Sequence, residues 1–552
     1  MLVVATGCSG DGGGGDGGSG DRDRDGDGSA AQDGPAPLPP LHAVRGERPG
    51  VFDDAGRQVV LRGVNLNGLA EYARNNPDLD PTLPLTDATW DQIADEGFNV
   101  VRLLVSWSRL EPERGEIDDA YVDEVRAAVR SAAQRGIYTV VDMHQDAWGP
   151  FVATPAGVTC PAGREPANGW DGAPAWATPD AAAGVSSCRP AEGESKPGSD
   201  LVVEAWDRFY RDADGIRSSL VDVWEHLATE LADEPSIAGY DLLNEPGHGR
   251  GATAPTGGLL SDFPALGDFY AEATGAIRRG EEAAGVHPRP VFFEHSVAGN
   301  PPPPDFSDDP GLVFAPHIYG GSIVTFLSVD QNWDVMLSLA EGWGTGIWVG
   351  EYGWWDDPAE RPEIVDRVEQ FGVREDGGPA EGGGPAGGGS ADGGPAVVPV
   401  GSAWWQWSNG CGDPHQITDA GIAAPDEIRQ YRVTSCAPGA AVGQDEGVVT
   451  EWREVLTRPA VRFAPGWITG LAADGPAGTL EVTADEATPG AEVELWVPAP
   501  DGGEQPVVGG DGIAAVDAVR RGQGWRVTAE VCSASYEVVV GPAASPAGEA
   551  CH

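Results

Sequence analysis

Apolar runs that end in polar or aromatic residues recur along the chain and alternate with amphipathic stretches. The runs are rich in β-branched and aromatic residues, and between them apolar residues recur at helical spacing, as in 118–136 and 209–233. Near-continuous apolar strands are typical of parallel strands that are buried on both faces. The eight runs are 61–70, 98–107, 137–146, 237–246, 290–296, 312–319, 346–355 and 400–408. Eight such strands separated by helices predict an α/β fold, a closed (β/α)₈ TIM barrel.

The pattern changes towards both ends of the chain and is interrupted twice. Residues 1–40 contain a Gly/Asp-rich tether, and 41–466 are expected to form the barrel domain. Apolar and polar residues alternate between Gly, Pro and Asp turns in 467–552, which predicts a small antiparallel β-sandwich domain. The insertion 147–200 is long enough to form a lid or wall over the barrel mouth. The Gly-rich insertion 374–397 is predicted to be disordered.

Charge narrows the possible partners. The 552 residues carry 34 Lys and Arg against 87 Asp and Glu, a formal net charge of −53. Such an acidic surface disfavours binding to nucleic acid and electrostatic docking on anionic lipid. No segment reaches the ~20 continuous apolar residues that a membrane-spanning helix needs. We therefore expect neither a nucleic-acid partner nor a spanning helix.

The N-terminus and the cysteines indicate the compartment. Cys8 follows a short apolar stretch and small residues and precedes the tether, which resembles a bacterial lipoprotein signal whose cysteine is lipidated. The stretch is short and has no basic residues, so either Met1 is not the true start, which we favour, or Cys8 is a chance residue. The other six cysteines fall into local pairs: Cys160/Cys188, Cys411/Cys436 and Cys532/Cys551.

Three disulfides predict an exported bacterial protein, lipid-anchored to the cell membrane or secreted. The alternative is six free thiols in a cytosolic chain. The sequence contains no CxxC and no His/Cys metal spacing, so no metal site and no cofactor are predicted.

Two glutamates stand at the ends of predicted strands. Glu245 follows the fourth run and Glu351 lies in the seventh. The carboxyl ends of barrel strands carry the active sites of such folds, and these two ends face each other across the mouth. Retaining glycoside hydrolysis needs two carboxyl groups ~5–5.5 Å apart, one as nucleophile and one as acid and then base. A single glutamate at a strand end is commonly just a solvated carboxylate, but the pair predicts this chemistry.

The residues around both glutamates resemble those of glycoside hydrolase family 5. "NEP" at 244–246 and "GEYG" at 350–353 are similar to that family's acid/base and nucleophile segments, and the resemblance covers roughly 45–465. It implies that Glu245 is the acid/base and that Glu351 attacks the anomeric carbon. Glu245 must then carry a proton at working pH, while a neighbouring cation keeps Glu351 ionised.

The resemblance also implies the partners of the two carboxyl groups. Arg102 is expected to neutralise and orient the nucleophile, and His144 and Asn244 to hydrogen-bond sugar hydroxyls. His317 and Tyr319 are expected to support the two carboxyl groups. The expected aromatic platform under the sugar is Trp407, with Trp405 as the second choice.

One subgroup of the family fits best. "VVDMHQDAW" (140–148), "YDLLNEP" (240–246), the C-terminal sandwich and Arg458-Pro459 are similar to endoglycoceramidases, which hydrolyse the bond between a glycan and ceramide. Asp146 matches an aspartate that those enzymes use for the head-group sugar. They also place a lysine after the first strand, whereas the first lysine here is Lys196, and 67–80 offers Asn67, Arg74 and Asn75 instead. The preferred head group therefore stays open.

The expected partner is a glycolipid or oligosaccharide substrate, with membrane contact only through the lipid anchor or a lipid substrate, and the chain is expected to be a monomer. Two alternatives remain. A family 5 endo-β-glucanase or mannanase would act on soluble polysaccharide across an open cleft. A non-catalytic glycan-binding lipoprotein would be expected to lack one of the two carboxylates, and both are present.

Overall fold

The computed structural model describes residues 37–180, 185–191, 199–249, 264–297, 299, 301–321, 324, 327–353, 365, 368, 399–415, 417–418, 421–422, 431–435, 444–499, 502–542 and 544–551. All of them belong to one compact unit, residues 35–552. Cys8, the insertion 374–397 and Cys436 lie outside the described residues. Among the described helices, none is both long and apolar enough to span a membrane.

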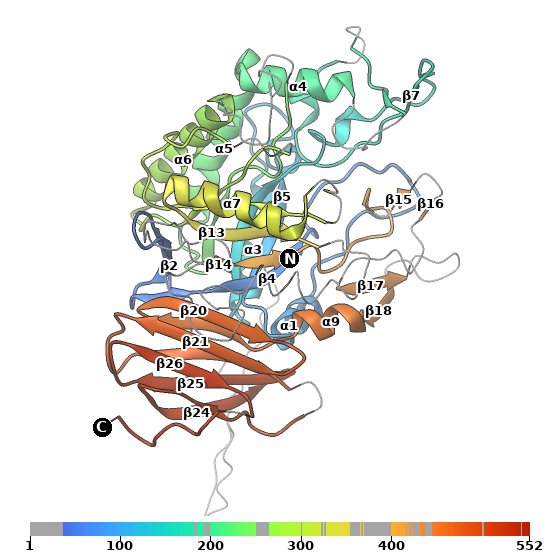
Figure 1. The fold of residues 1–552 in the computed structure, drawn as a ribbon. Coiled ribbons are helices and arrows are strands. Elements are labelled where there is room, and N and C mark those ends of the chain that lie inside the picture. The colour runs from blue at the N-terminus through green and yellow to red at the C-terminus, as the bar shows by residue number, and fades with distance from the viewer. Residues whose placement is uncertain are drawn as a thin grey trace, which may run out of the picture. The chain divides into compact units, whose positions relative to one another are not determined.

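A closed ring of parallel strands lies at the centre of this unit (Figure 1). Neighbouring strands pair in chain order, and the pairings of β11 with β13 and of β14 with β4 close the ring. Two short strands, β11 and β12, share the sixth position because both pair with β13. The strands are β4 (Leu61–Leu66), β5 (Val100–Ser106), β6 (Tyr138–His144), β9 (Ile237–Asp241), β10 (Val291–Phe293), β11 (Leu312–Phe314), β12 (His317–Ile318), β13 (Gly346–Tyr352) and β14 (Pro399–Trp404). Each coincides with one of the eight predicted runs, with β14 beginning one residue before its run, and the predicted TIM barrel is confirmed.

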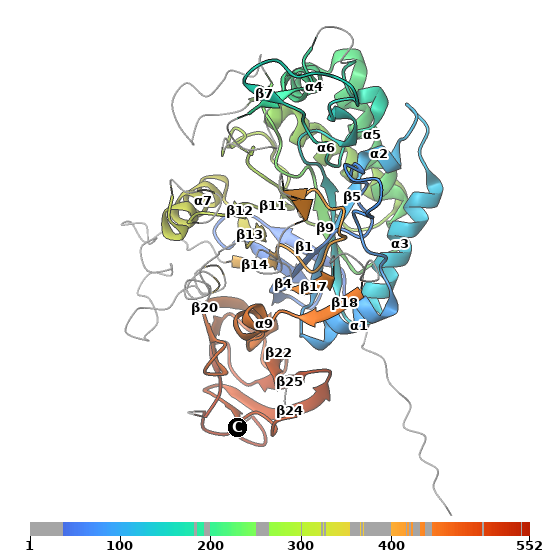
Figure 2. The same cartoon turned by 90° about the vertical axis from the view of Figure 1, so that its right-hand side faces the viewer.

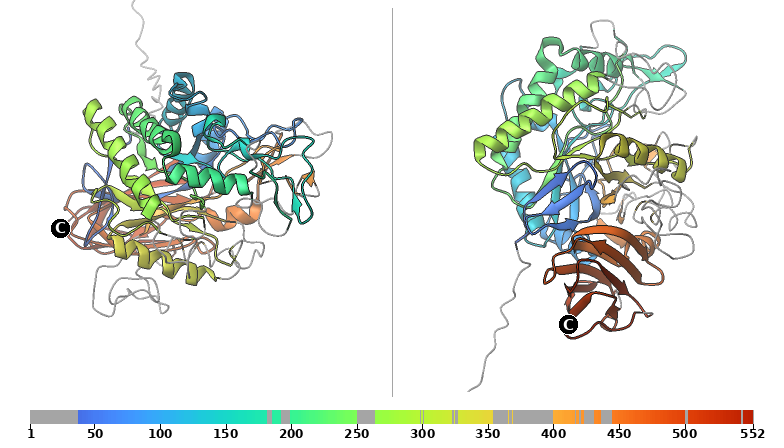
Figure 3. Two further views of the ribbon diagram at one scale, coloured as in Figure 1. Left: turned by 90° about the horizontal axis from the view of Figure 1, so that it is seen from above. Right: turned by 60° about the vertical axis from the view of Figure 1, so that its left-hand side comes forward.

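Helices flank the ring, with α3 and α5 on one side of it and α7 on the other in the turned view of Figure 2. The two long green helices seen from above in Figure 3, α5 and α6, pack against each other. The helices are α1 (Asp87–Asp95), α2 (Trp107–Leu110), α3 (Asp119–Ala133), α4 (Asp200–Tyr210), α5 (Ile216–Glu230), α6 (Pro264–Ala284), α7 (Val329–Trp343) and α9 (Thr450–Leu456). The expected helix in 118–136 is α3, which begins where the Asp118 side chain accepts hydrogen bonds from the first free backbone amides.

The second expected helical stretch, 209–233, is divided in two. Helix α4 ends at Tyr210 and α5 begins at Ile216. Between them Asp212, Asp214 and Gly215 adopt left-handed backbone angles, with φ of 49°, 57° and 71°. Glycine accepts such angles without strain, and aspartate tolerates them better than most residues. The polar segment between the two apolar stretches is therefore a turn and not part of one helix.

The insertion after β6 is stapled and packs on the barrel through aromatic rings. It contains the short pair β7 (Arg164–Glu165) and β8 (Arg189–Pro190), and the predicted disulfide Cys160–Cys188 is present. The rings of Trp148 and Trp176 meet Trp107 edge-on at 6.3 and 5.3 Å between centroids. The predicted disulfide Cys532–Cys551 is also confirmed, and Cys411 is disulfide-bonded.

Antiparallel sheets make up the C-terminal region, as the alternating pattern predicts (Figure 1). The four-stranded sheet contains β20 (Trp467–Asp474), β21 (Thr479–Asp485), β26 (Tyr536–Val540) and β23 (Val508–Gly509). The seven-stranded sheet contains β1 (Leu41–Val44), β2 (Gly50–Asp53), β3 (Arg57–Val59), β19 (Ala460–Pro465), β22 (Glu492–Pro498), β25 (Gly524–Val531) and β24 (Ile513–Arg521). The sequence pattern did not reveal that the three strands before the barrel join this sheet, through the pairing of β3 with β19.

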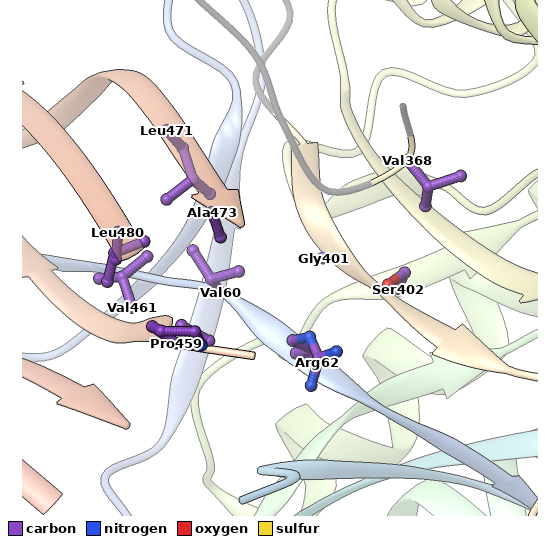
Figure 4. Close-up of a pocket in the computed structure, with 11 residues that line it drawn as sticks. Val60, Arg62, Val368, Gly401, Ser402, Pro459, Val461, Leu471, Ala473 and Leu480 are labelled. Carbon is purple, nitrogen blue, oxygen red and sulfur yellow. The ribbon is translucent and has the colours of Figure 1, made fainter. Parts of the chain in front are cut away.

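These sheets meet the barrel where its strands begin. Figure 4 shows Val60, which directly precedes β4, beside Val461, Leu471 and Leu480 from β19, β20 and β21. Apolar side chains from both sides fill most of this junction, and buried valines and leucines of the two sheets continue it as one core. The carboxyl ends of the barrel strands, where Glu245 and Glu351 are placed, therefore lie away from the sandwich.

The contact between Gly97 and Trp496 can be used to test how tightly the barrel and the C-terminal sheets fit together. Gly97 has φ +85° between α1 and β5, and a Cβ there would overlap the Trp496 indole of β22. Gly115 has φ +78° with nothing within 4 Å of a Cβ, so Gly115→Ala measures backbone strain alone. We predict that Gly115→Ala lowers the free energy of unfolding by about 1–2 kcal/mol. Gly97→Ala should lower the free energy of unfolding by a further ~1–3 kcal/mol, because the overlap of the new Cβ with Trp496 adds to the backbone strain. Equal losses in urea titrations of the two variants would show that the junction is loose.

Candidate active site

The two predicted glutamates meet at the mouth of the barrel. Glu351 is the sixth residue of β13, and Glu245 lies four residues beyond the end of β9. One carboxylate oxygen of each, together with a ring nitrogen of His317, lies within 4.8 Å of the others. The His317 Nδ1 atom is 2.9 Å from Glu245 Oε1 and 3.3 Å from Glu351 Oε2. Two carboxyl groups this close are spaced for a retaining double displacement and leave no room for a water between sugar and base.

Arg102 on β5 anchors the site from beneath. Its guanidinium is fully buried, and it contacts Glu351 Oε1 at 2.7 Å through Nη1. The same group meets three further carboxylates and two asparagines, which are Asp142 at 3.0 Å, Asp241 at 2.8 Å, Glu294 at 2.9 Å, Asn65 at 3.2 Å and Asn244 at 3.0 Å. A planar guanidinium with five fixed donors suits such a set. Arg102 thereby fixes the position of Glu351 relative to four other strands.

The two carboxyl groups have different surroundings. Glu351 is held by Arg102 and by the Tyr319 hydroxyl, which donates to Oε2 at 2.9 Å, and its side chain is 5% exposed. The Glu245 side chain is 16% exposed and contacts His317. A group that remains ionised and shielded suits a nucleophile, whereas a more open carboxyl group suits proton exchange with a leaving group and water.

The backbone at Glu245 is strained, and this explains the polar "NEP" segment after an apolar strand. Glu245 has φ +36°, a value that costs a non-glycine residue free energy. Its backbone N–H donates to Glu294 Oε2 at 2.9 Å, and its carbonyl accepts from Gln145 Nε2 at 2.9 Å. The neighbouring Asn244 donates through Nδ2 to the Gln145 carbonyl at 3.0 Å. These bonds hold the segment in a conformation that turns Glu245 towards Glu351.

Burial and charge shift several pKa values around Arg102. Burial raises the pKa of Asp142 to about 7, although Arg102 and His317 act to lower it. Burial likewise raises the pKa of Glu294 to about 8, against the opposing effect of His317. For His317, burial favours the neutral ring, but the carboxylates of Glu294 and Glu351 outweigh it and raise the pKa well above its usual value. His317 is therefore a cation at neutral pH, placed between the carboxyl groups of Glu245 and Glu351.

The residues predicted to bind the sugar lie on the neighbouring side of the mouth. His144 Nδ1 is 2.6 Å from Asp142 Oδ2, which fixes the ring and turns Nε2 towards Asp146 Oδ2, at 3.9 Å. The His144 ring stacks on Trp405, with 5.4 Å between centroids and 14° between planes. Trp405 also packs with Tyr319 in one small buried group. His144, Asp146 and Trp405 are thus brought together beside Glu351.

Trp407, the first choice for the platform, lies elsewhere. Its ring stacks on Tyr431 at 5.1 Å and meets Phe98 edge-on at 6.5 Å, in the main core of the barrel. Successive residues of a strand point to opposite faces, but 405–407 follow the end of β14, where the alternation no longer holds. The structure therefore places Trp405, the second choice, with the other site residues.

Several residues of the site were not identified from the sequence. Three of them are buried acids within apolar runs: Asp142, Asp241 and Glu294. The other two are Asn65 and His415, which lie next to Arg102 and Asp146, respectively. A signal existed, because an acid inside a run of buried strand residues needs a partner. The stretch 67–80 has structural roles: Asn67 donates to Asp413 at 2.9 Å, Arg74 pairs with Asp80, and Asn75 exchanges hydrogen bonds with Gly169.

Two groups of described side chains have atoms close enough to hold a metal ion. One consists of Glu245, His317 and Glu351, and the other of His144, Asp146 and Asp171. In the first group His317 is a cation, as argued above, so its Nδ1 carries a proton and is a donor, not a ligand. The first group is better suited to proton transfer than to metal binding.

The chain belongs to glycosyl hydrolase family 5. The family model described as Cellulase (glycosyl hydrolase family 5) matches residues 52–370. A crystal structure of endogalactoceramidase is 35% identical and superposes with a TM-score of 0.75, covering 91% of this chain and 99% of that one. Endo-glycoceramidase II from Rhodococcus sp. is 23% identical with a TM-score of 0.59, over 89% of this chain and 99% of the other, and supports the fold.

Among curated proteins, Endoglycoceramidase I of Rhodococcus hoagii is 30% identical over 301 residues, which is 51% of this chain and 54% of that protein. The Endoglycoceramidase of Hydra vulgaris is 27% identical over 36% of this chain and 38% of its own length. The chain thus spans about half or less of the length of these two curated relatives.

Glu294 can be tested by comparing two buried glutamates. Glu294→Gln keeps one oxygen for the Glu245 N–H but places an NH2 group, a donor, where Oε1 faces the donors of Arg102 and His317. Hydrogen bonds to charged groups contribute about 1.5–3 kcal/mol, so kcat should fall on the order of tenfold to hundredfold. Glu281 is equally buried but pairs with Arg278 and Arg289 near the beginning of β10. Glu281→Gln should leave kcat within about twofold, and equal losses in both variants would contradict a specific role of Glu294.

The raised pKa of Glu294 predicts a pH dependence of stability. The folded chain holds this proton up to about pH 8, whereas the ordinary glutamate value is 4.5. The folded state then binds more protons than the unfolded state between these values, so wild-type stability falls as pH rises through this window. The wild-type free energy of unfolding minus that of Glu294→Gln should decrease from pH 4.5 to 8 by up to about 1.4 kcal/mol per pH unit. A difference that stays constant or grows with pH would mean that Arg102 and His317 keep Glu294 ionised.

Proposed function

We propose that this chain is a retaining β-glycosidase that removes the glycan from glycosphingolipids by cleaving the bond between glycan and ceramide. The observation that carries the proposal is the pair Glu245 and Glu351, with carboxylate oxygens within 4.8 Å and His317 between them. A shared family and similarity to an endogalactoceramidase over 91% of the chain support it. The reaction is a double displacement in which Glu351 forms and then loses a bond to the anomeric carbon.

In the first step Glu351 attacks the anomeric carbon while Glu245 protonates the departing oxygen. Arg102 and Tyr319 hold the two oxygens of Glu351, which fixes its direction of attack. Asn244 uses one N–H for the Gln145 carbonyl, so its second N–H can reach a sugar hydroxyl.

In the second step water replaces the lipid. Once Glu351 is esterified its negative charge is gone, so Glu245 loses its proton more readily and activates the water. The water then releases the sugar with retained configuration. His317 contacts both carboxyl groups. It can therefore balance the negative charge when this charge shifts from Glu351 to Glu245 during the reaction.

Features outside the reaction centre support a lipid-linked substrate. The insertion after β6 exposes two large apolar side chains, Phe151 at 46% and Val158 at 47%. They belong to the insertion that carries Trp148 and Trp176 and follows the carboxyl end of β6, and exposed apolar side chains there suit an acyl chain better than a second sugar.

The alternative within the family is an endo-β-glucanase or mannanase, which the description of the matching model as Cellulase keeps open. Such an enzyme needs aromatic platforms on both sides of the scission point. A non-catalytic glycan-binding protein is disfavoured, because Arg102, His317 and Tyr319 are all arranged around the two carboxylates.

We also propose an extracytoplasmic location, with the chain lipid-anchored through Cys8 or secreted, acting as a monomer. Two disulfides between described residues support an oxidising compartment. Mass spectrometry of the membrane fraction of an expressing bacterium would test the anchor, since a diacylated Cys8 peptide is expected and an unmodified one would exclude it.

Hydrolysis of a defined panel tests the substrate class. Glucosyl-, galactosyl- and lactosylceramide in detergent are compared with cellulose and mannan, with Glu351→Gln as the inactive control. Release of intact glycan and ceramide from at least one glycolipid, with no activity on the polysaccharides, is expected. The reverse pattern would favour the polysaccharide enzyme, and no activity on any substrate would favour the binding protein.

The roles of the two glutamates predict different responses to leaving-group quality. Glu245→Ala should lose ~10²–10⁴-fold on a substrate with a poor leaving group. It should still form the glycosyl-enzyme from a dinitrophenyl glycoside, because the dinitrophenolate leaving group departs without a proton. Glu351→Gly should lose both steps, but azide can occupy the vacated space and yield an inverted glycosyl azide. Equal losses of Glu245→Ala on both substrates, with no azide rescue of Glu351→Gly, would show that the roles are assigned wrongly.

A further inference from the structure

His415 stands between two carboxylates on the sugar side of the mouth. Its Nδ1 is 2.8 Å from Asp413 Oδ1, and its Nε2 is 3.3 Å from Asp146 Oδ2. Asp413 is itself buried and fixed by Asn67, which donates to its other oxygen at 2.9 Å. The His415 side chain is 3% exposed. Asp413 thus fixes the ring through Nδ1, and Nε2 faces the Asp146 carboxylate that is expected to meet the head-group sugar.

The same arrangement occurs on the other side of Asp146. His144 is pinned at Nδ1 by Asp142 and directs Nε2 towards Asp146. Two imidazoles, each anchored by its own aspartate, thus converge on one carboxylate. They share one indole, because His144 stacks on Trp405 and His415 meets it at 5.2 Å and 62°. Trp405 packs in turn against Tyr319, whose hydroxyl donates to Glu351.

This geometry is suited to a neutral polyhydroxylated ring. An aromatic face packs against the apolar face of a sugar, a carboxylate accepts from hydroxyls, and the Nε2–H of His415 can be shared between Asp146 and a sugar oxygen. Asp171 lies beside Asp146 and His144, and this excess of negative charge disfavours an acidic sugar. Trp170 closes the opposite side of His415, with 5.0 Å between ring centroids.

We propose that His415 determines head-group specificity by binding, together with Asp146, hydroxyls of a neutral sugar next to the scissile bond. Asp413 is a positioning residue that acts through His415, because it fixes the ring from the nitrogen that faces away from Asp146. The inference rests on the proposed glycosidase function and goes beyond it by assigning recognition to the loop after β14.

The test combines a variant with substrates that lack one hydroxyl. His415→Gln and wild type are compared on an aryl β-galactoside, an aryl β-glucoside and the 3-, 4- and 6-deoxy forms of the better one. A polar group left unpaired by a missing partner makes a large difference to kcat/KM. His415→Gln should lose on the order of tenfold to hundredfold on the intact glycoside, as expected for a charged hydrogen bond. On one deoxy analogue the loss should shrink to about twofold, because the partner hydroxyl is already absent.

Asp413→Asn is the second variant, and it should raise KM for the intact glycoside. KM for the deoxy analogue on which His415→Gln has little effect should stay unchanged in Asp413→Asn. His226, which faces Asp119 on the outer helices, supplies the control, and His226→Gln should change no substrate by more than about twofold. A loss in His415→Gln that is the same on every deoxy analogue would overturn the proposal, since a merely structural residue would behave in this way. If wild type hydrolyses none of the glycosides, it is the proposed function that fails; a wild type that is active, with His415→Gln unchanged, refutes only the role of His415.

Discussion

One buried guanidinium organises the active site of this barrel. Arg102 meets the carboxyl groups of Asp142 on β6, Asp241 on β9, Glu351 on β13 and Glu294, which directly follows β10. A buried charge is costly unless it is paired and hydrogen-bonded, so these groups require one another. Arg102 cannot be neutralised, and the excess of acid around it is balanced by protons that burial retains on Asp142 and Glu294 and by the His317 cation. The position of Glu351, the strained turn at Glu245 and the orientation of His144 all depend on this network.

The network also links chemistry to recognition. It extends from Glu351 through Arg102 to Asp142 and His144, and then by way of Asp146 to His415 and Asp413. In the proposed mechanism the members near Glu351 handle charge during the reaction, and in the proposed recognition those around Asp146 meet the sugar. Recognition is therefore built on rigid strand ends and their short extensions, which suits a site that must hold geometry to a fraction of an ångström.

The sequence was sufficient for the barrel and for placing Glu245 and Glu351 at the ends of its strands, because both follow from local patterns. Each barrel strand is a continuous apolar run, and Glu245 and Glu351 lie where such runs end. Long-range pairing was not visible in this way. Strands β1 to β3 are short, and only the structure shows that β3 pairs with β19 about four hundred residues later. The same holds for Glu294 and His415, whose partners come from other strands, and for Trp407, whose direction depends on an irregular segment after β14.

The most direct test of this account is to trap the covalent intermediate that it requires. A 2-deoxy-2-fluoro glycosyl fluoride slows the second step more than the first, so the glycosyl-enzyme should accumulate and be visible by intact-protein mass spectrometry. The account predicts one sugar per chain and, after proteolysis, a modified peptide that carries the sugar on Glu351. A sugar attached to Glu245 or Glu294, or turnover of the fluoride with inverted configuration and no adduct, would contradict it.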